Sequence, residues 1–300
     1  MSEPILSDAE IEQFVARGFV RLSGCFSREL ALESTRRACE RLYCSLDDPA
    51  TWPEGRVRAP ETGRVPFEDI APRAWRAACE LIGGTERALS CTWGDGYIIN
   101  FGKEASPWQP PSPVIHREEW LLWHKDGDFF RHFLDSPEQG LLVIAVFSDI
   151  ADQGGGTYLA CDSVGHVARF LAEHPEGVLP RGTPCEEIIG KCEDFIEATG
   201  SIGDVYLMHP FMLHTRSINP SGRARFIINP PVKLKEPMRF ARPDPREHSP
   251  VERAVLRALG KDSYDFVPSQ PREAIIPERL QRDKAFWEER ARQAGVVPSP

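Results

Sequence analysis

The first third of the chain places apolar residues at helical intervals among polar ones. Ser7 precedes Glu10 by three residues, which is the spacing of a helix N-terminal capping box, and Gly18 follows the last apolar position. The apolar spacing predicts three helices, over residues 7–17, 27–46 and 72–82. A Gly- and Pro-rich stretch at residues 53–66 predicts a loop between the second and third of them.

The centre of the chain has a different pattern, because short β-type runs are separated by Gly, Pro, Asn and Asp. These runs predict six strands, over residues 96–101, 120–124, 141–147, 157–160, 205–208 and 225–229. A helix over residues 162–172, with Asp162 as its N-cap, interrupts the strands. Two charged helices follow, over residues 250–259 and 277–294.

Taken together, these patterns predict a mainly β protein with flanking α-helices. We expect a single domain over residues 1–300, with a β core at about 95–231. Helices within 7–82 would precede this core, and a helical extension at 249–294 would follow it. The 27 prolines and 23 glycines agree with many turns and short strands rather than a helical bundle.

Composition and charge narrow the classes of function. With 41% hydrophobic residues and a net charge of −9, the 300 residues indicate a globular chain that lacks the basic surplus typical of nucleic-acid binding. The longest clearly apolar run, residues 141–147, is too short to span a bilayer, and the first residues do not resemble a signal peptide. The eight cysteines form no C-x-x-C pair, which favours free thiols and a cytoplasmic protein over a zinc module.

The segment around His124 and Asp126 carries the clearest chemical signal. The two residues are two apart at the end of a predicted strand, so their side chains leave the same face and can bind one metal ion. Imidazole and carboxylate are donors that Fe(II) accepts, and a histidine from another strand would complete a 2-His-1-carboxylate triad. Two similar pairs, His116 with Glu118 and His174 with Glu176, lack a clear strand setting, and we interpret them as structural.

A second signal lies near residue 214, where a predicted strand is followed by a histidine and the next strand begins with Arg225. A dicarboxylate co-substrate bound to iron needs a cationic group for its far carboxylate, and the guanidinium matches that carboxylate with two parallel hydrogen bonds. Both His209 and His214 precede this arginine, and they would point to opposite faces of a regular strand.

These residues resemble the phytanoyl-CoA dioxygenase-like branch of the Fe(II)/2-oxoglutarate oxygenases. The resemblance spans about residues 5–230. It rests on the opening Leu6-Ser-Asp-Ala-Glu segment, the His124/Asp126 pair, the Gly154-Gly155-Gly156-Thr157 turn, and the end from Gly203-Asp204 through His214 to Arg225. In this family the distal iron ligand is the second histidine of an H-P-x-x-[LI]-H pattern, and the co-substrate arginine lies eleven residues later. That spacing favours His214 over His209.

The resemblance implies a double-stranded β-helix, which is a cupin-like jelly roll with iron in its mouth. It implies that His124, Asp126 and His214 hold Fe(II), with 2-oxoglutarate and O2 as co-substrates and Arg225 as the anchor of 2-oxoglutarate. Because the related halogenases lack the carboxylate that Asp126 provides, hydroxylation, desaturation or oxidative cyclisation of a small molecule is the expected outcome. Natural-product or amino-acid-derived metabolism is the expected setting, and the oligomeric state is left open between monomer and homodimer.

Further site residues follow from the same resemblance, each with an alternative. Asn100 and Thr157 are candidate co-substrate contacts, although Asn100 also suits a turn before Gly102 and Thr157 a plain strand position. Substrate contacts are expected from three residues, Phe130, Trp123 and Arg216, although an aromatic at the position of Phe130 is as often a plain core residue. Arg216 stands where the family often has a small hydroxyl residue. Lys125, between the first two ligands, is expected to be solvated.

Two rival interpretations remain at this point. A cupin-like isomerase or a non-catalytic binding protein would use the same histidines without 2-oxoglutarate, and Arg225 speaks against it because such a protein needs no buried guanidinium opposite the metal. In a purely structural scaffold, the ordered His124, Asp126, His214 and Arg225 pattern would have no purpose.

Overall fold

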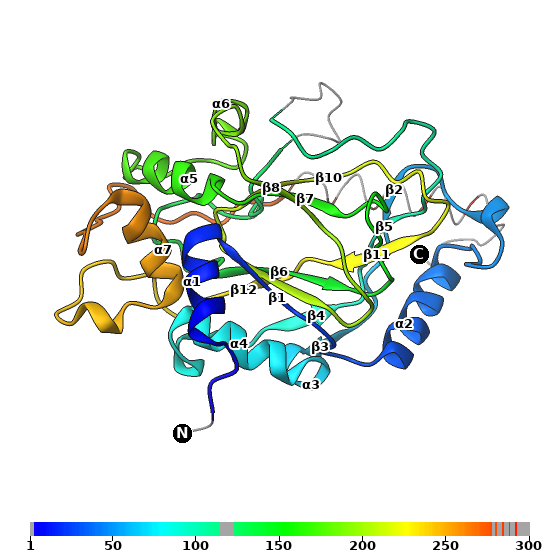
Figure 1. Ribbon diagram of the computed structural model, residues 1–300, viewed down its shortest axis with the longest axis horizontal. Helices are drawn as coiled ribbons and strands as arrows, with labels where there is room; N and C mark the ends of the chain where they lie inside the picture. Colours follow the sequence, from blue (N-terminus) through cyan, green and yellow to red (C-terminus); the bar gives the residue numbers. More distant parts are fainter. Residues whose placement is uncertain are drawn as a thin grey trace.

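The computed structural model describes residues 3–113 and 123–277, together with positions 280, 284, 288 and 292. Two antiparallel sheets form its centre (Figure 1). The larger, seven-stranded sheet runs in the order β1 (Phe19–Leu22), β9 (Val205–Met208), β6 (Leu141–Val146), β11 (Arg225–Ile228), β5 (Ile98–Asn100) and β2 (Arg56–Arg58), and β12 (Pro231–Val232) also pairs with β6. The smaller sheet consists of β10 (Leu213–Arg216), β7 (Thr157–Ala160) and β8 (Phe195–Ala198). A separate pair joins β3 (Arg64–Pro66) to β4 (Thr92–Gly94).

The order in which the chain visits the two sheets is that of a jelly roll. After β5 and β6 in the large sheet come β7 and β8 in the small sheet. The chain then returns to β9 in the large sheet, crosses to β10 in the small one, and comes back to β11 and β12 of the large sheet. All of these pairings are antiparallel. The predicted double-stranded β-helix is therefore confirmed, because strands that alternate between two facing sheets are what defines it.

Helices cover the outer face of the large sheet and flank the small one (Figure 1). They are α1 (Asp8–Arg17), α2 (Arg28–Arg41), α3 (Phe67–Ile70), α4 (Pro72–Ile82), α5 (Ser163–Ala172), α6 (Cys185–Ile189) and α7 (Pro250–Leu259), with short 3-10 turns at Pro49–Thr51, Thr85–Arg87 and Pro245–Glu247. α7 contacts α1, α4 and α5, and α1 contacts β1. Every residue of β6 is buried because this strand is covered on both faces.

The predicted helix at the start of the chain is confirmed in detail. The Ser7 hydroxyl accepts from the Glu10 N–H, the Glu10 carboxylate accepts from the Ser7 N–H at 2.8 Å, and Gly18 ends the helix with a φ of 72°. A side chain at Gly18 would approach within 2.6 Å of Val164, so this position needs glycine for space as well as for conformation. The helices over 72–82 and 250–259 are also confirmed, with the predicted bounds.

Several other element predictions were wrong or incomplete. The helix from residue 27 ends at Arg41 instead of 46, because Tyr43 takes a left-handed φ of 54°. Asp162 does not cap α5, and its carboxylate instead accepts from the Glu193 N–H at 2.8 Å. The loop at 53–66 contains β2 and β3, while β1, β4, β8, β10 and β12 were not predicted.

Two predicted elements fall largely outside the described residues, namely the strand over 120–124 and the helix over 277–294. Of the first, Trp123 and His124 are described, and His124 pairs with His214 as an isolated bridge beside β10. Among the described helices, none combines the length and apolarity that crossing a membrane requires.

Candidate metal centre

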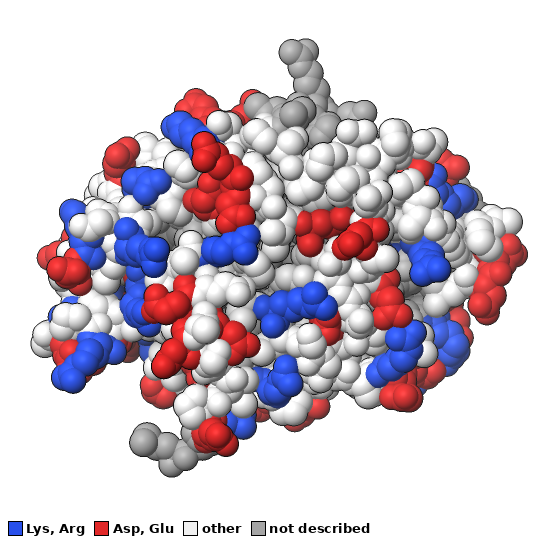
Figure 2. Space-filling view, in the orientation of Figure 1, with Lys and Arg blue, Asp and Glu red and all other residues white. Residues whose placement is uncertain are grey.

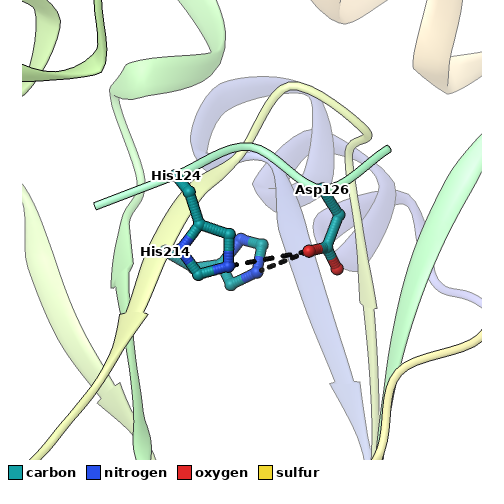
Figure 3. Close-up of side chains that lie close together, drawn as sticks. All are labelled: His124, Asp126 and His214. Carbon is teal, nitrogen blue, oxygen red and sulfur yellow. Dashed lines mark ion pairs between the residues drawn. The ribbon is translucent and has the colours of Figure 1, made fainter. Parts of the chain in front are cut away.

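His124, Asp126 and His214 come together at the open edge of the small sheet (Figure 3). One oxygen of Asp126, Oδ1, lies 3.6 Å from Nε2 of His124 and 3.6 Å from Nε2 of His214. The two imidazole rings lie side by side with centroids 4.5 Å apart. Two ring nitrogens and one carboxylate oxygen therefore point at a common position, which is the arrangement of a facial metal triad.

The backbone dictates this juxtaposition. The His124 N–H donates to the His214 carbonyl and the His214 N–H donates to the His124 carbonyl, each at 3.0 Å, so the two residues sit opposite one another on neighbouring strands. Asp126 follows in a turn that requires Gly127, where φ is 113°. A side chain at Gly127 would come within 2.6 Å of the Phe130 ring. The turn thus brings the carboxylate under both histidines.

Hydrogen bonds orient two of the three side chains. Nδ1 of His214 lies 3.1 Å from the Met212 carbonyl, so the ring N–H is used there and Nε2 is left with its lone pair toward Asp126. Nδ2 of Asn229 donates to Oδ2 of Asp126 at 2.9 Å, which directs Oδ1 toward the histidines. Such outer hydrogen bonds are typical of protein metal sites, where they set the tautomer and the direction of the ligand.

The charges of the three groups are strongly coupled. Burial alone would raise the pKa of the Asp126 carboxyl, but the His214 and His124 charges outweigh it and hold this pKa well below its usual range. Burial opposes the protonation of His214, yet the Asp126 carboxylate raises the pKa of this imidazole. A cation between these groups would replace the protons that pair them.

A pocket extends from the triad into the space between the two sheets. Including its open mouth it holds about 400 Å³. Its lining combines residues of both sheets: Arg56, Ile98, His124, Leu142, Ile144, Thr157, His214, Thr215, Arg216, Arg225, Ile227 and Asn229. Apolar side chains such as Ile98, Leu142 and Ile144 and polar ones such as Thr157 and Arg225 both line it, as in small-molecule sites in general.

Arg225 is the most unusual group in this pocket. Its side chain is buried, with the residue only 2% exposed, and neither Nε nor Nη1 has a hydrogen-bond partner among the described residues. Burial, with the charges of Arg56 and Arg216, lowers the pKa of Arg225 to about 9. A buried guanidinium without partners is costly, and a bound carboxylate would supply the missing acceptor.

Arg216 also faces the pocket, but a carboxylate of the protein neutralises it. Its Nη1 lies 2.5 Å from Oε1 of Glu104. Oε2 of Glu104 in turn accepts from Nδ2 of Asn100 at 3.0 Å and from the Asn219 N–H at 2.6 Å. Oδ1 of Asn100 accepts from the Gly102 N–H at 3.1 Å, so the turn interpretation of Asn100 is the one these contacts support.

The remaining predicted site residues lie in different places. Thr157 lines the pocket beside Arg216, its partner in the β7–β10 ladder. Trp123 instead lines a neighbouring hollow with Tyr158 and Gln109, since adjacent strand positions point to opposite faces. Phe130 is buried against the His132 ring and does not line either hollow.

The expectation that Lys125 is solvated was wrong. The side chain is half-buried, and its Nζ contacts Nδ1 of His132 and lies 5.9 Å from the centre of the Phe130 ring. Burial lowers the pKa of Lys125 to about 7.

The histidines that were set aside have structural surroundings. His209 is fully buried, and its Nε2 contacts the Val251 carbonyl at 3.3 Å while Nδ1 accepts from the Phe211 N–H at 3.1 Å. His174 pairs locally with Glu176 at 2.7 Å on the surface, as expected. His116 and Glu118 lie outside the described residues.

Three residues of the site have no role in the sequence analysis. Asn229 belongs to the Asn-Pro-Pro segment that closes the β region, and only its place at the end of β11 could have indicated a link to Asp126. Glu104 and Arg56 come from outside the motif-bearing strands, and we find no sequence signal for either. They reach the pocket through tertiary contacts alone.

Comparison with known proteins gives similar structures but no family. No family model matches the sequence, and no curated protein matches it. The fold is similar to that of the non-heme alpha ketoglutarate dependent carbocyclase SnoK from nogalamycin biosynthesis, with 16% identity over 76% of this chain and 84% of that one and a TM-score of 0.45.

Two further solved structures are similar at the same level. The epimerase SnoN, in complex with Fe3+, alpha ketoglutarate and nogalamycin RO, has 15% identity over 75% of this chain and 82% of that chain, with a TM-score of 0.46. The non-heme monooxygenase ThoJ, in a nickel complex, has 13% identity over 94% and 97% of the two chains and a TM-score of 0.44. Because identities and TM-scores are this low, the functional proposal below depends on the site's own residues.

Proposed function

We propose that this protein is an Fe(II)/2-oxoglutarate-dependent oxygenase that oxidises a C–H bond of a small molecule. The observation that carries the proposal is that His124 and His214 of the triad line the same pocket as Arg225, whose Nε and Nη1 have no hydrogen-bond partner among the described residues. A triad alone fits many metal proteins. The addition of a buried cationic fork within reach of the same cavity is what a chelating dicarboxylate needs.

The donor set fits ferrous iron. Two imidazoles and one carboxylate leave three positions of an octahedral ion free for co-substrates, and this set is diagnostic of non-haem Fe(II) oxygenases. His124 is the accessible member, because its side chain is 46% exposed whereas that of His214 is buried. The entrance for a substrate would therefore lie on the His124 side.

The pocket also fits 2-oxoglutarate. Arg225 would bind its far carboxylate through two N–H groups, and the apolar chain would pack on Ile98, Leu142 and Ile227. Thr157 would lie within the same cavity as a hydroxyl contact. Because Glu104 neutralises Arg216, Arg225 is the guanidinium that we expect to match the distal carboxylate.

When loaded, such a centre would use O2 as the oxidant for the oxidative decarboxylation of 2-oxoglutarate to succinate and CO2, coupled to oxidation of a substrate C–H bond. The role of the protein's own residues is to hold the metal ligands in place and to orient them. Asn229 fixes the Asp126 carboxylate, the Met212 carbonyl fixes the tautomer of His214, and the buried strands keep bulk water from the inner end of the pocket.

The proposal extends to the partners and the setting of the protein. We propose a single-domain enzyme that acts on a small molecule, in natural-product or amino-acid-derived metabolism. On the face shown in Figure 2, acidic and basic side chains are interspersed, which favours a small-molecule enzyme over a nucleic-acid binder. All eight cysteines are free thiols, in keeping with a reducing, cytoplasmic compartment.

An anaerobic titration tests the proposal. Fe(II) followed by 2-oxoglutarate should produce the weak visible charge-transfer band of a chelated iron complex, and His214→Ala should abolish it. Arg225→Ala should shift it to much higher 2-oxoglutarate concentration. If Fe(II) binds but no band forms at any 2-oxoglutarate concentration, the cupin-like alternative, a metal protein without 2-oxoglutarate, would be favoured instead.

Once the band is observed, measuring succinate release in the presence of amino acids, acyl-CoAs and peptides would identify the class of substrate.

A further inference from the structure

A second group of potential metal ligands lies away from the pocket, beside the small sheet. Asp162 and His166 stand at the start of α5, four residues apart and so on the same helix face, and Cys192 lies in the segment that leads from α6 into β8. A carboxylate oxygen, a ring nitrogen and a sulfur from these three side chains all lie within 4.8 Å of one another. The group therefore joins two segments that are distant in sequence.

The three side chains are held in place, and one polar atom among them lacks a partner. Oδ2 of Asp162 accepts from the Glu193 N–H at 2.8 Å, which fixes the carboxylate. Its other oxygen, Oδ1, is buried and has no hydrogen-bond partner among the described residues. Cys192 is buried, while His166 is half-buried and leaves one side of the group accessible. A buried carboxylate oxygen without a donor is costly unless something binds it.

We propose that Asp162, His166 and Cys192 bind a divalent cation of the zinc type, independently of the iron site. A mixed sulfur, nitrogen and oxygen set suits tetrahedral Zn²⁺, and water from the accessible side would take the fourth position. Oδ1 of Asp162 would coordinate the ion. The ion would then link the start of α5 to the segment between α6 and β8 that carries Cys192.

Two arginines lie close to the proposed metal ligands, and their contacts favour Cys192 over Cys161 as the sulfur ligand. The adjacent thiol, Cys161, contacts Arg17, whose Nη2 lies 3.8 Å from its sulfur, and Arg17 is also paired with Asp194. The Cys192 thiol donates to the Ile188 carbonyl at 3.3 Å, and this bond would be lost when the thiol gives up its proton to bind a metal. Arg169 contacts Nδ1 of His166 at 3.2 Å, and metal binding would displace this contact. Such a contact at an exposed position is weak and costs little to lose.

Cobalt separates the two sites spectroscopically. The iron site offers no sulfur, so a thiolate-to-cobalt charge-transfer band in the near ultraviolet reports only on a site with cysteine. Metal-free full-length protein titrated with Co(II) should show this band, and the His124→Ala/His214→Ala double variant should retain it. Zn²⁺ should displace the cobalt and raise the unfolding temperature of both proteins.

Matched variants decide which residues bind. Cys192→Ser should abolish the band, and His166→Ala, at a half-buried position that tolerates truncation, should weaken Co(II) binding by about tenfold or more. Cys161→Ser is the control and should leave the band unchanged. The proposal is overturned if wild-type protein shows no band with stoichiometric Co(II), if Cys192→Ser retains it, or if His166→Ala binds as tightly as wild type.

Discussion

Two histidines five residues apart differ completely in their surroundings. The His214 imidazole directs Nε2 toward Asp126, whereas both ring nitrogens of His209 are used by backbone groups. We therefore expect His214→Ala to abolish stoichiometric Fe(II) binding and His209→Gln to retain it with reduced stability. Metal analysis after anaerobic gel filtration measures both, and equal loss of iron in the two variants would contradict the assignment of His214.

Arg225 is expected to govern 2-oxoglutarate affinity rather than metal binding. Among the described residues its Nε and Nη1 have no hydrogen-bond partner, so this buried guanidinium is available to a bound carboxylate. Arg225→Ala should raise the 2-oxoglutarate dissociation constant at least about 30-fold, the equivalent of about 2 kcal/mol for a lost buried charge pair. Arg225→Lys should recover only part of this, because an ammonium lacks the planar fork. Unchanged Fe(II) binding in both variants is the control, and unchanged 2-oxoglutarate affinity would count against the proposed co-substrate.

Asn229 is expected to support the metal through Asp126. Its amide donates to the carboxylate oxygen that faces away from the histidines. Asn229→Ala should weaken Fe(II) binding by about 10- to 100-fold, the usual effect of removing such an outer hydrogen bond. Asn229→Asp is a sharper variant, because it places a second carboxylate against Asp126 and should weaken binding further. Competition with a calibrated chelator measures both, and wild-type affinity in Asn229→Ala would show that Asp126 needs no such support.

At the residue scale, the sequence was informative where side-chain spacing alone determines geometry. A separation of two residues keeps side chains close, so the proximity of His124 and Asp126 could be predicted, although a turn and not a continuous strand brings the Asp126 carboxylate to the histidines. The contact between Glu104 and Arg216 could not be predicted, because it joins residues 112 positions apart and has no local pattern. The prediction that Lys125 is solvated was wrong for a related reason. Its burial depends on contacts with His132 and Phe130, which form only when the chain is folded.

At the scale of elements, α7 depends on one buried carboxylate. Glu252 is fully buried, completes the capping box with Ser249, and pairs with Arg87 at 2.6 Å and Arg242 at 3.1 Å. Burial would raise the pKa of Glu252, but its hydrogen bonds to Arg87 and Arg242 lower it. Its contribution to stability is therefore present above its unfolded pKa of about 4.3 and is lost as the pH falls through the folded value.

Glu252→Gln should lower the free energy of unfolding by about 3 kcal/mol or more, because two arginines lose their buried counter-charge. The exposed pair of Glu12 with Arg253 provides the control, and Glu12→Gln should cost less than about 1 kcal/mol. Urea denaturation at neutral pH compares them. Equal costs for the two variants would show that burial of Glu252 adds nothing.

Helices were easier to predict than strands for a physical reason. Helix ends are encoded locally, as in the Ser7 capping box and the left-handed Gly18, so α1 could be located from sequence. β10 has all four residues buried and mixes Leu, His, Thr and Arg, so it shows no alternation of apolar and polar positions. Its polar side chains are buried because they line the pocket. A strand that contributes several residues to a site therefore lacks the alternation of apolar and polar residues by which strands are predicted from sequence.

At the scale of the whole molecule, the alternation of strands between two sheets could not be read from the strand pattern alone. Every pairing in the small sheet joins segments that are separated by long connections, such as β7 with β10. The jelly roll was predicted only through the family resemblance, and the antiparallel order of both sheets confirms it. The same arrangement brings His124, His214 and Arg225 around one cavity, although they come from three separate segments.

The whole molecule should lose stability in mild acid because His209 is buried in its neutral form. Burial lowers the pKa of His209 from its ordinary value of about 6.5 to about 3. Between these values the unfolded chain binds a proton that the folded chain does not, so the free energy of unfolding should fall by about 1.4 kcal/mol per pH unit from this residue alone. The effect is absent above pH 6.5, and Glu252 adds its own loss only at lower pH, because its pKa is lowered in the folded chain.

His209→Gln isolates this contribution, because glutamine can still donate to the Val251 carbonyl but does not titrate. Urea unfolding of metal-free protein between pH 7 and pH 5 should show a shallower loss of stability in His209→Gln than in wild type, by about 1.4 kcal/mol per pH unit. His174→Gln is the control, because it removes a surface imidazole and leaves the buried one in place. Identical slopes of the unfolding free energy against pH in wild type and His209→Gln would contradict this prediction. They would mean that His209 takes up a proton in the folded protein, with the packing of α1 and α7 around it opening in mild acid.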